Sequence, residues 1–150
     1  MRTTIQRVSR ASVKINELVY SEIGKGLLIF LGIEVEDGAG DVEWLCKKIS
    51  RLRIFADENS AMNLSINEVN GEILVISQFT LHAKTKKGNR PSFIKAARPE
   101  IAIPLYEEFI INLEQLTKKE VKRGDFGAYM QVSLINDGPV TILIDTKNKE

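Results

Sequence analysis

The stretch SQFTL, residues 77–81, places two hydroxyl groups and one carboxamide within four residues. It follows an apolar run at 73–76 that is typical of a buried strand. A buried polar group without a partner costs about 1–3 kcal/mol, so a polar strand end usually meets solvent or a ligand. One interpretation is a strand that frays into its loop, with Ser77 and Thr80 bonded to nearby backbone. The other is a substrate platform whose hydroxyl, amide and backbone N–H groups hold a polarised carbonyl.

The tetrad Asn136-Asp137-Gly138-Pro139 lies between two apolar, β-branched runs. Asp-Gly is a strong turn signal and proline can open a strand, so the simplest prediction is a β-hairpin that joins strands at 128–135 and 139–145. That prediction leaves one feature unexplained, because Pro139 removes a backbone donor from the start of the second strand. X–Pro bonds are cis in only about 5–6% of cases in folded proteins, so these residues alone do not predict a cis bond.

Residues 84–99 are polar, basic and interrupted by glycine and proline, which predicts a long loop. Its cationic residues are Lys84, Lys86, Lys87, Arg90, Lys95 and Arg98. Such a run is by default a solvated loop. The alternative is a patch beside SQFTL that contacts phosphates, which would suit a nucleic-acid substrate.

Several common catalytic devices are missing from the sequence. His82 is the only histidine, so a His-cluster metal site is excluded and a Ser-His-Asp triad would have to use this residue. The acidic residues lack metal-binding spacings such as DxD or HExxH, so no metal is predicted. Without a base within reach, a serine or threonine is a poor nucleophile, which favours positioning and oxyanion stabilisation over covalent catalysis. Cys46, the single cysteine, suits a small core residue better than a nucleophile.

The elements that must position these residues are mostly strands. Strand segments are predicted at 11–15, 18–20, 27–35, 72–77, 119–123, 128–135 and 139–145. The segment 27–35 is a continuous apolar run, which indicates burial on both faces. A helix is predicted over 41–53 with Asp41 as its N-cap, and another over 100–117 in which Pro104 fits only near the first turn.

Strands outnumber helices and often follow one another directly. This order predicts an α+β fold in which mainly antiparallel sheets curl toward a barrel with two flanking helices. At 150 residues the chain has the size of one ordinary domain, so residues 1–150 are expected to form a single domain. The net charge of +1 does not indicate a partner drawn by overall charge. With no apolar signal region and no run of about 18 apolar residues, the sequence predicts a cytoplasmic protein without a membrane partner.

Taken in order and at their spacing, several stretches resemble the D-aminoacyl-tRNA deacylase family, also known as D-tyrosyl-tRNA deacylases. The resemblance runs from residue 1 to about 145 and rests on MRTTIQRVSRASV, IGKGLLIFLGIE, KISRLRIF, MNLS, VISQFTL, KGNRPSF and FGAYMQVSLINDGPVTILID. Each stretch alone is a weak signal, whereas the ordered set is highly specific.

The resemblance implies a homodimeric hydrolase that needs no cofactor and does not act on DNA. Its substrate would be the ester between a D-amino acid and the 3′-terminal adenosine of tRNA. Ser77, Gln78, Phe79 and Thr80 would line the aminoacyl pocket, where backbone N–H groups polarise the carbonyl and the tRNA 2′-hydroxyl assists water. Gly138–Pro139 would carry a cis peptide into the partner's pocket, bind the substrate amino group and block L side chains. Exclusion of this kind admits glycine, so glycyl-tRNA mischarged on tRNA-Ala is a further implied substrate.

Other roles follow from the same resemblance. Arg7 would brace the Gly-Pro backbone; the alternative is an exposed strand charge. Phe126 and Met130 would pack against the terminal adenine, although both also suit a core. Lys84, Lys86, Lys87 and Arg90 would bind tRNA. His82 and Tyr129 depart from the family's usual pattern, in which the first position is often aromatic or apolar and the second acidic.

Three classes of function are therefore compatible with the sequence. The first is a D-aminoacyl-tRNA deacylase that relies on backbone oxyanion stabilisation. The second is a non-catalytic RNA- or peptide-binding module that uses the basic loop. The third is a small-ester hydrolase with Thr80 as its nucleophile, and a covalent role for Thr80 also competes within the deacylase interpretation.

Overall fold

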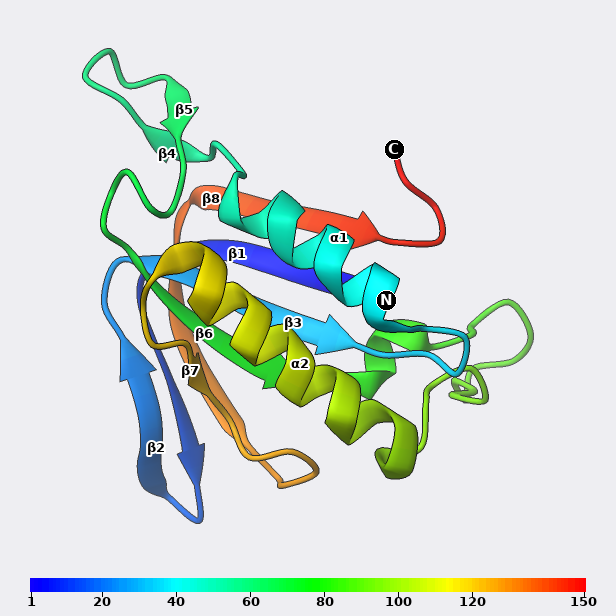
Figure 1. Cartoon of the computed structure of the whole chain (residues 1–150). Helices are drawn as coiled ribbons and strands as arrows, with labels where there is room; N and C mark the ends of the chain where they lie inside the picture. Colours follow the sequence, from blue (N-terminus) through cyan, green and yellow to red (C-terminus); the bar gives the residue numbers. More distant parts are fainter.

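The computed structural model describes residues 1–150 and contains a six-stranded mixed sheet, a two-stranded ribbon and two α-helices (Figure 1). The elements are β1 (Arg2–Ile15), β2 (Leu18–Ile23), β3 (Gly26–Gly32), α1 (Ala39–Ser50), β4 (Phe55–Ala56), β5 (Met62–Leu64), β6 (Glu72–Ser77), the 3-10 turn η1 (Phe79–His82), α2 (Pro99–Thr117), β7 (Lys122–Arg123) and β8 (Gln131–Asp145). The main sheet has the order β2-β1-β3-β6-β7, and β8 pairs with β1.

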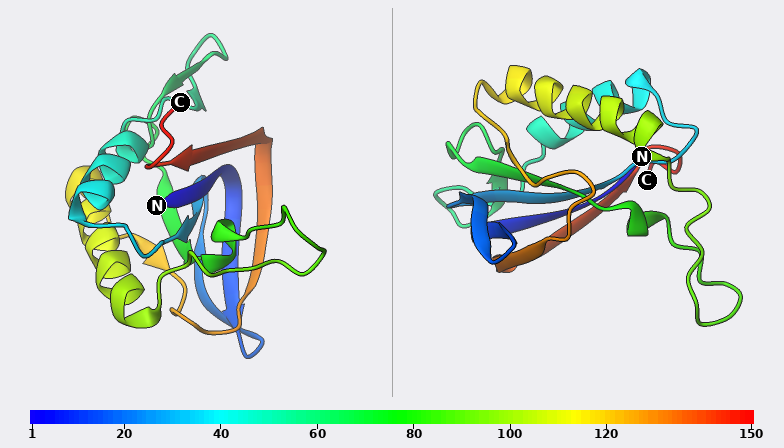
Figure 2. Two further views of the ribbon diagram at one scale, coloured as in Figure 1. Left: turned by 90° about the vertical axis from the view of Figure 1, so that its right-hand side faces the viewer. Right: turned by 90° about the horizontal axis from the view of Figure 1, so that it is seen from below.

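Strand β1 pairs with three other strands of the main sheet. Its first half lies between β3 and β8, whereas its second half pairs with β2 and β8. All pairings of β1 are antiparallel, and those of β6 with β3 and β7 are parallel. The sheet curls nearly into a barrel, and α1 and α2 lie together over one of its faces (Figure 2). The predicted α+β class, with a curled sheet and two flanking helices, is confirmed.

The central strand β3 is covered on both faces. Leu27, Ile29 and Leu31 belong to the larger core cluster, which includes residues of both helices. Leu28 points to the other side, into a smaller cluster with residues of β1, β2 and β6. The two coverings explain why the strand is a continuous apolar run, as the sequence predicted.

Both predicted helices are present, with differences at their ends. Helix α1 begins at Ala39, and Asp41 is its third residue rather than the N-cap; the Asp41 carboxylate accepts a hydrogen bond from the Gly38 N–H at 3.1 Å. Pro104 lies inside α2, beyond the first turn where it was expected. Cys46 is fully buried, and burial raises the pKa of its thiol to about 12, which confirms it as a core residue. Neither helix combines the length and apolarity needed to cross a membrane.

The predicted hairpin around the Asn-Asp-Gly-Pro tetrad is wrong. Instead of two strands joined by a turn, residues 131–145 form one strand whose two halves pair with the same partner, β1. Between the pairs Gln6–Thr141 and Val8–Asn136, β1 has one residue and β8 has four, 137–140. The tetrad therefore contributes to a bulge that projects from a continuous strand. The local turn signals correctly indicated an irregularity in the strand. They did not distinguish a hairpin turn from a bulge.

Candidate active site

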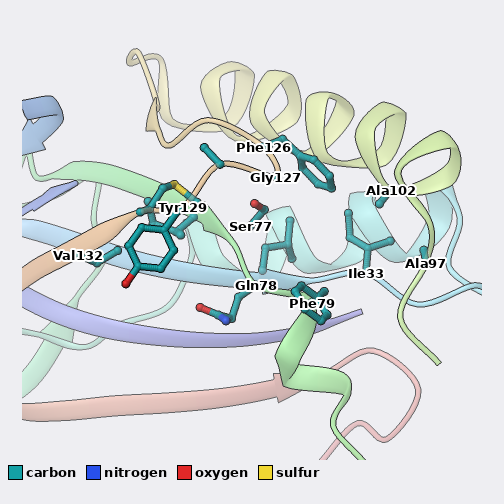
Figure 3. Close-up of a pocket in the computed structure, with 14 residues that line it drawn as sticks. Ile33, Ser77, Gln78, Phe79, Ala97, Ala102, Phe126, Gly127, Tyr129 and Val132 are labelled. Carbon is teal, nitrogen blue, oxygen red and sulfur yellow. The ribbon is translucent and has the colours of Figure 1, made fainter. Parts of the chain in front are cut away.

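A cavity of about 250 Å³ opens where β6 ends and η1 begins (Figure 3). Eleven of its 14 lining residues are hydrophobic, so the interior is mainly apolar. The lining consists of Leu31, Ile33, Ile76, Ser77, Gln78, Phe79, Ala97, Ala102, Phe126, Gly127, Ala128, Tyr129, Met130 and Val132. Three of the four residues predicted to be catalytic are in this lining, and Thr80 follows directly in η1.

The sheet holds the polar stretch in place through its backbone. Ser77 ends β6 opposite Leu31 of β3, and the Gln78 N–H donates to the Leu31 carbonyl at 2.7 Å. The chain then turns back over the end of β3 at Gly32. A Cβ atom at Gly32 would lie 2.9 Å from the Gln78 carbonyl oxygen and 3.0 Å from the Leu81 Cβ. The absence of a side chain at Gly32 allows β3 and η1 to approach this closely.

The start of η1 presents two free backbone donors. The N–H groups of Phe79 and Thr80 donate to no acceptor within the chain, as is usual for the first residues of a helical turn. The Thr80 hydroxyl accepts a hydrogen bond from the Gln78 carboxamide, and no carboxylate or imidazole bonds to it. The arrangement can therefore bind a polarised carbonyl, but it contains no base that would activate the hydroxyl.

His82 does not supply that base. Its side chain is buried at the end of η1 with 1% exposure, and neither ring nitrogen has a hydrogen-bond partner within the chain. Its Cδ2 atom packs beside β3, 3.1 Å from the position of a Cβ on Gly32. The geometry excludes a Ser-His-Asp triad and makes His82 a packing residue beneath the turn.

The opposite wall of the cavity comes from the loop between β7 and β8. Phe126 and Met130 both lie in this wall. The Phe126 ring packs edge-on against Tyr106 of α2, with centroids 5.7 Å apart, and the Tyr106 hydroxyl donates to the Val75 carbonyl of β6 at 3.0 Å. Tyr129 is 87% exposed at the rim. Helix α2 thus fixes the aromatic wall relative to the strand that carries the polar stretch.

The predicted tRNA-binding cations lie outside the cavity on the loop that follows η1. Lys84, Lys86, Lys87 and Arg90 are all exposed. Backbone hydrogen bonds of 2.8 and 3.1 Å between Lys84 and Ser92 close this loop at its base, and the loop projects from the body of the molecule (Figure 2). Phe93, just beyond the base, packs edge-on against Phe79 with centroids 5.1 Å apart. The basic loop is therefore anchored to the candidate catalytic stretch.

The second candidate site is the bulge of β8. The Gly138–Pro139 peptide bond is cis, as the resemblance implied. Arg7 donates from Nε to the Asp137 carbonyl at 2.9 Å and from Nη1 to the Ile54 carbonyl at 2.6 Å. Its side chain is only 14% exposed, so Arg7 braces the bulge and is not a free surface charge. A Cβ on Gly138 would lie 2.7 Å from the Val140 Cγ2 atom, at a φ of +143°, so only glycine fits there without strain.

The pocket and the bulge lie far apart within one chain. The pocket end of β1 is marked by Arg2, whose Nη1 donates to the Leu81 carbonyl of η1 at 3.2 Å. The bulge lies opposite Arg7, near the middle of β1. Arg7 lies five positions after Arg2 along the strand, which corresponds to roughly 17 Å. The fold brings residues 77–80 together with Phe126 and Met130, but not with Gly138–Pro139 of the same chain.

Part of the cavity wall was missed by reasoning from the sequence. The missed residues are small or aliphatic: Ile33, Ala97, Ala102, Gly127, Ala128 and Val132. Such residues recur throughout protein cores and carry no chemical signal, so only their position in the fold identifies them. Four of them, Ile33, Gly127, Ala128 and Val132, lie in the stretches IGKGLLIFLGIE and FGAYMQVSLINDGPVTILID of the resemblance and could have been taken from it.

Comparisons with known proteins agree along the whole chain. A family model described as D-Tyr-tRNA(Tyr) deacylase matches residues 4–145. The D-aminoacyl-tRNA deacylases of Bacteroides thetaiotaomicron and Flavobacterium psychrophilum are 64% and 61% identical over 150 residues, with 100% of each chain covered. A solved structure described as c-Myc DNA Unwinding Element Binding Protein superimposes with a TM-score of 0.91 at 41% identity, over 97% of this chain and 98% of the other.

A more distant structure, described as a probable eukaryotic D-amino acid tRNA deacylase, has a TM-score of 0.81 at 16% identity, over 95% and 97% of the two chains. That likeness shows a shared fold. Together, the fold and the close relatives define the class of this protein as an enzyme, a hydrolase of ester bonds. Within this class, the chain belongs to the D-aminoacyl-tRNA deacylase family.

Proposed function

We propose that this protein hydrolyses the ester bond of D-aminoacyl-tRNA to free D-amino acid and tRNA, and that the Gly138–Pro139 bulge of a second copy rejects L-amino acids. The observation that carries the proposal is the layout of the two candidate sites. A pocket with free backbone donors lies near the start of β1, and an exposed, rigidly braced bulge lies opposite the middle of β1. Each is incomplete within one chain, and a two-fold pair would complete both.

The pocket suits ester hydrolysis without a catalytic base from the protein. The free N–H groups of Phe79 and Thr80 donate to the ester carbonyl oxygen. Water adds to the carbonyl carbon with help from the tRNA 2′-hydroxyl, and the developing oxyanion strengthens both hydrogen bonds. The ester C–O bond then breaks, and the 3′-oxygen of the tRNA leaves with a proton that originates from the water. One donor of this kind contributes roughly 10²–10³-fold in rate.

The apolar part of the cavity suits the terminal adenosine. Phe126 is held edge-on by Tyr106, and Met130 lies in the same wall. Nucleobases stack favourably on such surfaces, at about 1–3 kcal/mol per aromatic contact. Binding of the adenine there would place the aminoacyl ester near the polar stretch Ser77–Thr80.

A second copy is needed for chiral selection because the bulge cannot reach its own pocket. In a two-fold pair, each subunit contributes the same surface, so the bulge of one would meet the pocket of the other. The outer face of β8 supports such a pairing, since Leu143 is 75% exposed on the stretch of strand between the two sites. The active form is accordingly a homodimer.

Selection by the bulge works through exclusion. Its backbone carbonyls accept hydrogen bonds from the substrate amino group and occupy the direction that an L side chain would take. A D side chain points away from the bulge and fits. Glycine has no side chain to exclude, so glycyl-tRNA mischarged on tRNA-Ala is a substrate as well.

The basic loop supports binding of the tRNA backbone. Lys84, Lys86, Lys87 and Arg90 are exposed beside the pocket, and the contact between Phe93 and Phe79 fixes the loop relative to the ester. Phosphate contacts of this kind orient a nucleic acid without reading its sequence. A chain that leaves the cavity would therefore pass over these four cations.

The central test is incubation of the purified protein with D-tyrosyl-tRNA, L-tyrosyl-tRNA and glycyl-tRNA-Ala, followed by loss of the labelled amino acid. The proposal expects the D and glycyl esters to be hydrolysed and the L ester to persist. D-Tyrosine ethyl ester serves as a matched substrate without RNA. Equal loss of both tyrosyl-tRNAs would contradict chiral selection, binding of tRNA with all esters intact would indicate an RNA-binding module, and rapid cleavage of the ethyl ester would indicate a small-ester hydrolase.

A further inference from the structure

The bulge of β8 is closed at its base by one side chain, that of Asn136. Its Oδ1 atom accepts a hydrogen bond from the Val140 N–H at 2.9 Å, and its Nδ2 donates to the Thr141 hydroxyl at 2.9 Å. Because the Val140 N–H can only donate, the amide oxygen must face it, and the amide nitrogen must face Thr141. The carboxamide therefore links the last residue before the bulge to the first residues after its tip.

This side-chain link takes the place of the backbone hydrogen bonds that the sheet does not provide to the bulge. Residues 137–140 have no partner on β1, and Pro139 has no N–H group. The Val140 N–H is instead bound by the Asn136 side chain. The Thr141 hydroxyl also accepts a hydrogen bond from Gln6 Nε2 at 3.3 Å, which ties the closing residue of the bulge to β1.

Two side chains thus hold the two sides of Gly138–Pro139. Arg7 bonds to the Asp137 carbonyl on the side before the tip. Asn136 bonds to the Val140 N–H on the side after it. With both contacts in place, neither flank of the tip can rotate freely. Loss of either contact would release one flank.

We propose that Asn136 is a positioning residue for chiral selection, which sets the direction of the Gly138–Pro139 backbone by bridging Val140 and Thr141. The inference rests on the function proposed above, because only a bulge that acts as a filter needs one fixed direction. Asn136 itself does not touch the substrate. Without its amide, the Val140 N–H has no partner, and the bulge backbone can change direction. The space that an L side chain would need is then no longer blocked.

The test is the ratio of D- to L-tyrosyl-tRNA hydrolysis rates in Asn136→Ala, with the wild-type protein in parallel. Loss of the bridge should lower this ratio by about tenfold, the size expected when a hydrogen-bonded brace is removed. A wild-type ratio well above one keeps the proposed function intact whatever the variant does, so the two ideas can fail separately. A ratio in Asn136→Ala within about twofold of wild type would overturn the inference.

Two further variants separate positioning from general loss of structure. Asn136→Asp retains an oxygen for the Val140 N–H and can accept from the Thr141 hydroxyl, so its ratio should stay near that of the wild type; a fall as large as in Asn136→Ala would reject the bridge. Ser133→Ala, on the same exposed strand, is the matched control and should leave both rates unchanged. The melting temperature is measured for each variant, because a purely structural role would lower it and reduce both rates together.

If Asn136→Ala does not fold, Thr141→Val decides the matter. This variant keeps the bond to Val140 but removes the acceptor of Asn136 Nδ2, so the ratio should fall by about threefold. An unchanged ratio in a folded Thr141→Val protein would overturn the inference.

Discussion

At the end of β6, the free polar groups beside the pocket are backbone N–H donors of a short turn, and no hydrogen bond from a side chain of another element holds Phe79 or Thr80. In the bulge of β8 the exposed groups are also backbone, but side chains tie down both flanks of the tip. Arg7 reaches it from β1, and Asn136 closes it from within β8.

The difference follows from how each segment relates to the sheet. The turn η1 continues directly from a central strand, and the Gln78 N–H still bonds to β3, so the sheet itself sets its direction. The bulge leaves the sheet for four residues and has no ladder bonds of its own. A turn that continues directly from the hydrogen-bonded ladder depends little on side chains of other elements, whereas a segment that leaves the ladder depends on the side chains that brace it.

The largest effect is expected from Gly138→Ala. The new Cβ would lie 2.7 Å from Val140 Cγ2 and 2.8 Å from the Val140 nitrogen, so the bulge must shift. A displacement of about 1 Å at a positioning element can cost about 10²-fold, and we expect this loss in kcat/KM for D-tyrosyl-tRNA. Gly88→Ala is the matched control, because Gly88 also has a positive φ, of +70°, but has nothing within 4 Å of its Cβ position.

Mixing of two variants sharpens the same prediction. Ala128→Trp fills the cavity of the subunit that carries it and leaves its bulge intact. Gly138→Ala distorts the bulge of the subunit that carries it and leaves its cavity intact. If the bulge acts on the partner's pocket, a mixed dimer contains one site in which both parts are wild type, and activity returns when the inactive proteins are reassembled together. No recovery in verified mixed dimers would show that the two parts act within one chain.

A smaller effect is expected from Thr80→Ala, in the region that relies on backbone. The substitution deletes the hydroxyl but keeps the free backbone N–H, so the deacylation rate should fall by less than about tenfold. Single-turnover rates with D-tyrosyl-tRNA measure this directly. A loss of about 10³-fold or more in a folded variant would instead support Thr80 as a covalent nucleophile.

The smallest effect, of opposite sign, is expected from His82→Leu. The buried imidazole has no hydrogen-bond partner for either nitrogen, and an apolar side chain in the same place removes that cost. The free energy of unfolding should rise by about 1 kcal/mol, which corresponds to about 2–4 °C in melting temperature for a chain of this size. His82→Gln, which keeps a polar side chain in the same place, is the control and should show no such gain. A lower melting temperature in His82→Leu would mean that the imidazole has a partner in solution.

Much of the architecture follows from local patterns. The 3.6-residue periodicity predicted both helices, and the continuous apolar run at 27–35 predicted a strand buried on two sides, as β3 is. The polar end of the strand at 77–80 also stood out, because hydroxyl and amide groups rarely follow a buried run without a reason. The Asn-Asp-Gly-Pro tetrad was also recognisable as an irregularity, because Asp-Gly and proline are local turn signals.

Tertiary structure decided how these segments pair and where they lie relative to one another. The same Asp-Gly-Pro signal fits a hairpin or a bulge, and the choice depends on whether residues 131–145 pair with themselves or with β1, more than 100 positions away in the chain. Ala97 and Ala102 of the cavity wall lie outside every stretch of the resemblance, so only the tertiary structure identified them. Sequence alone located both helices and parts of the main strands, because those preferences are local, but it did not locate the ribbon of β4 and β5. Pairing between distant strands decided that the bulge lies opposite the middle of β1, away from the pocket, because register is set by contacts that no short stretch of sequence contains.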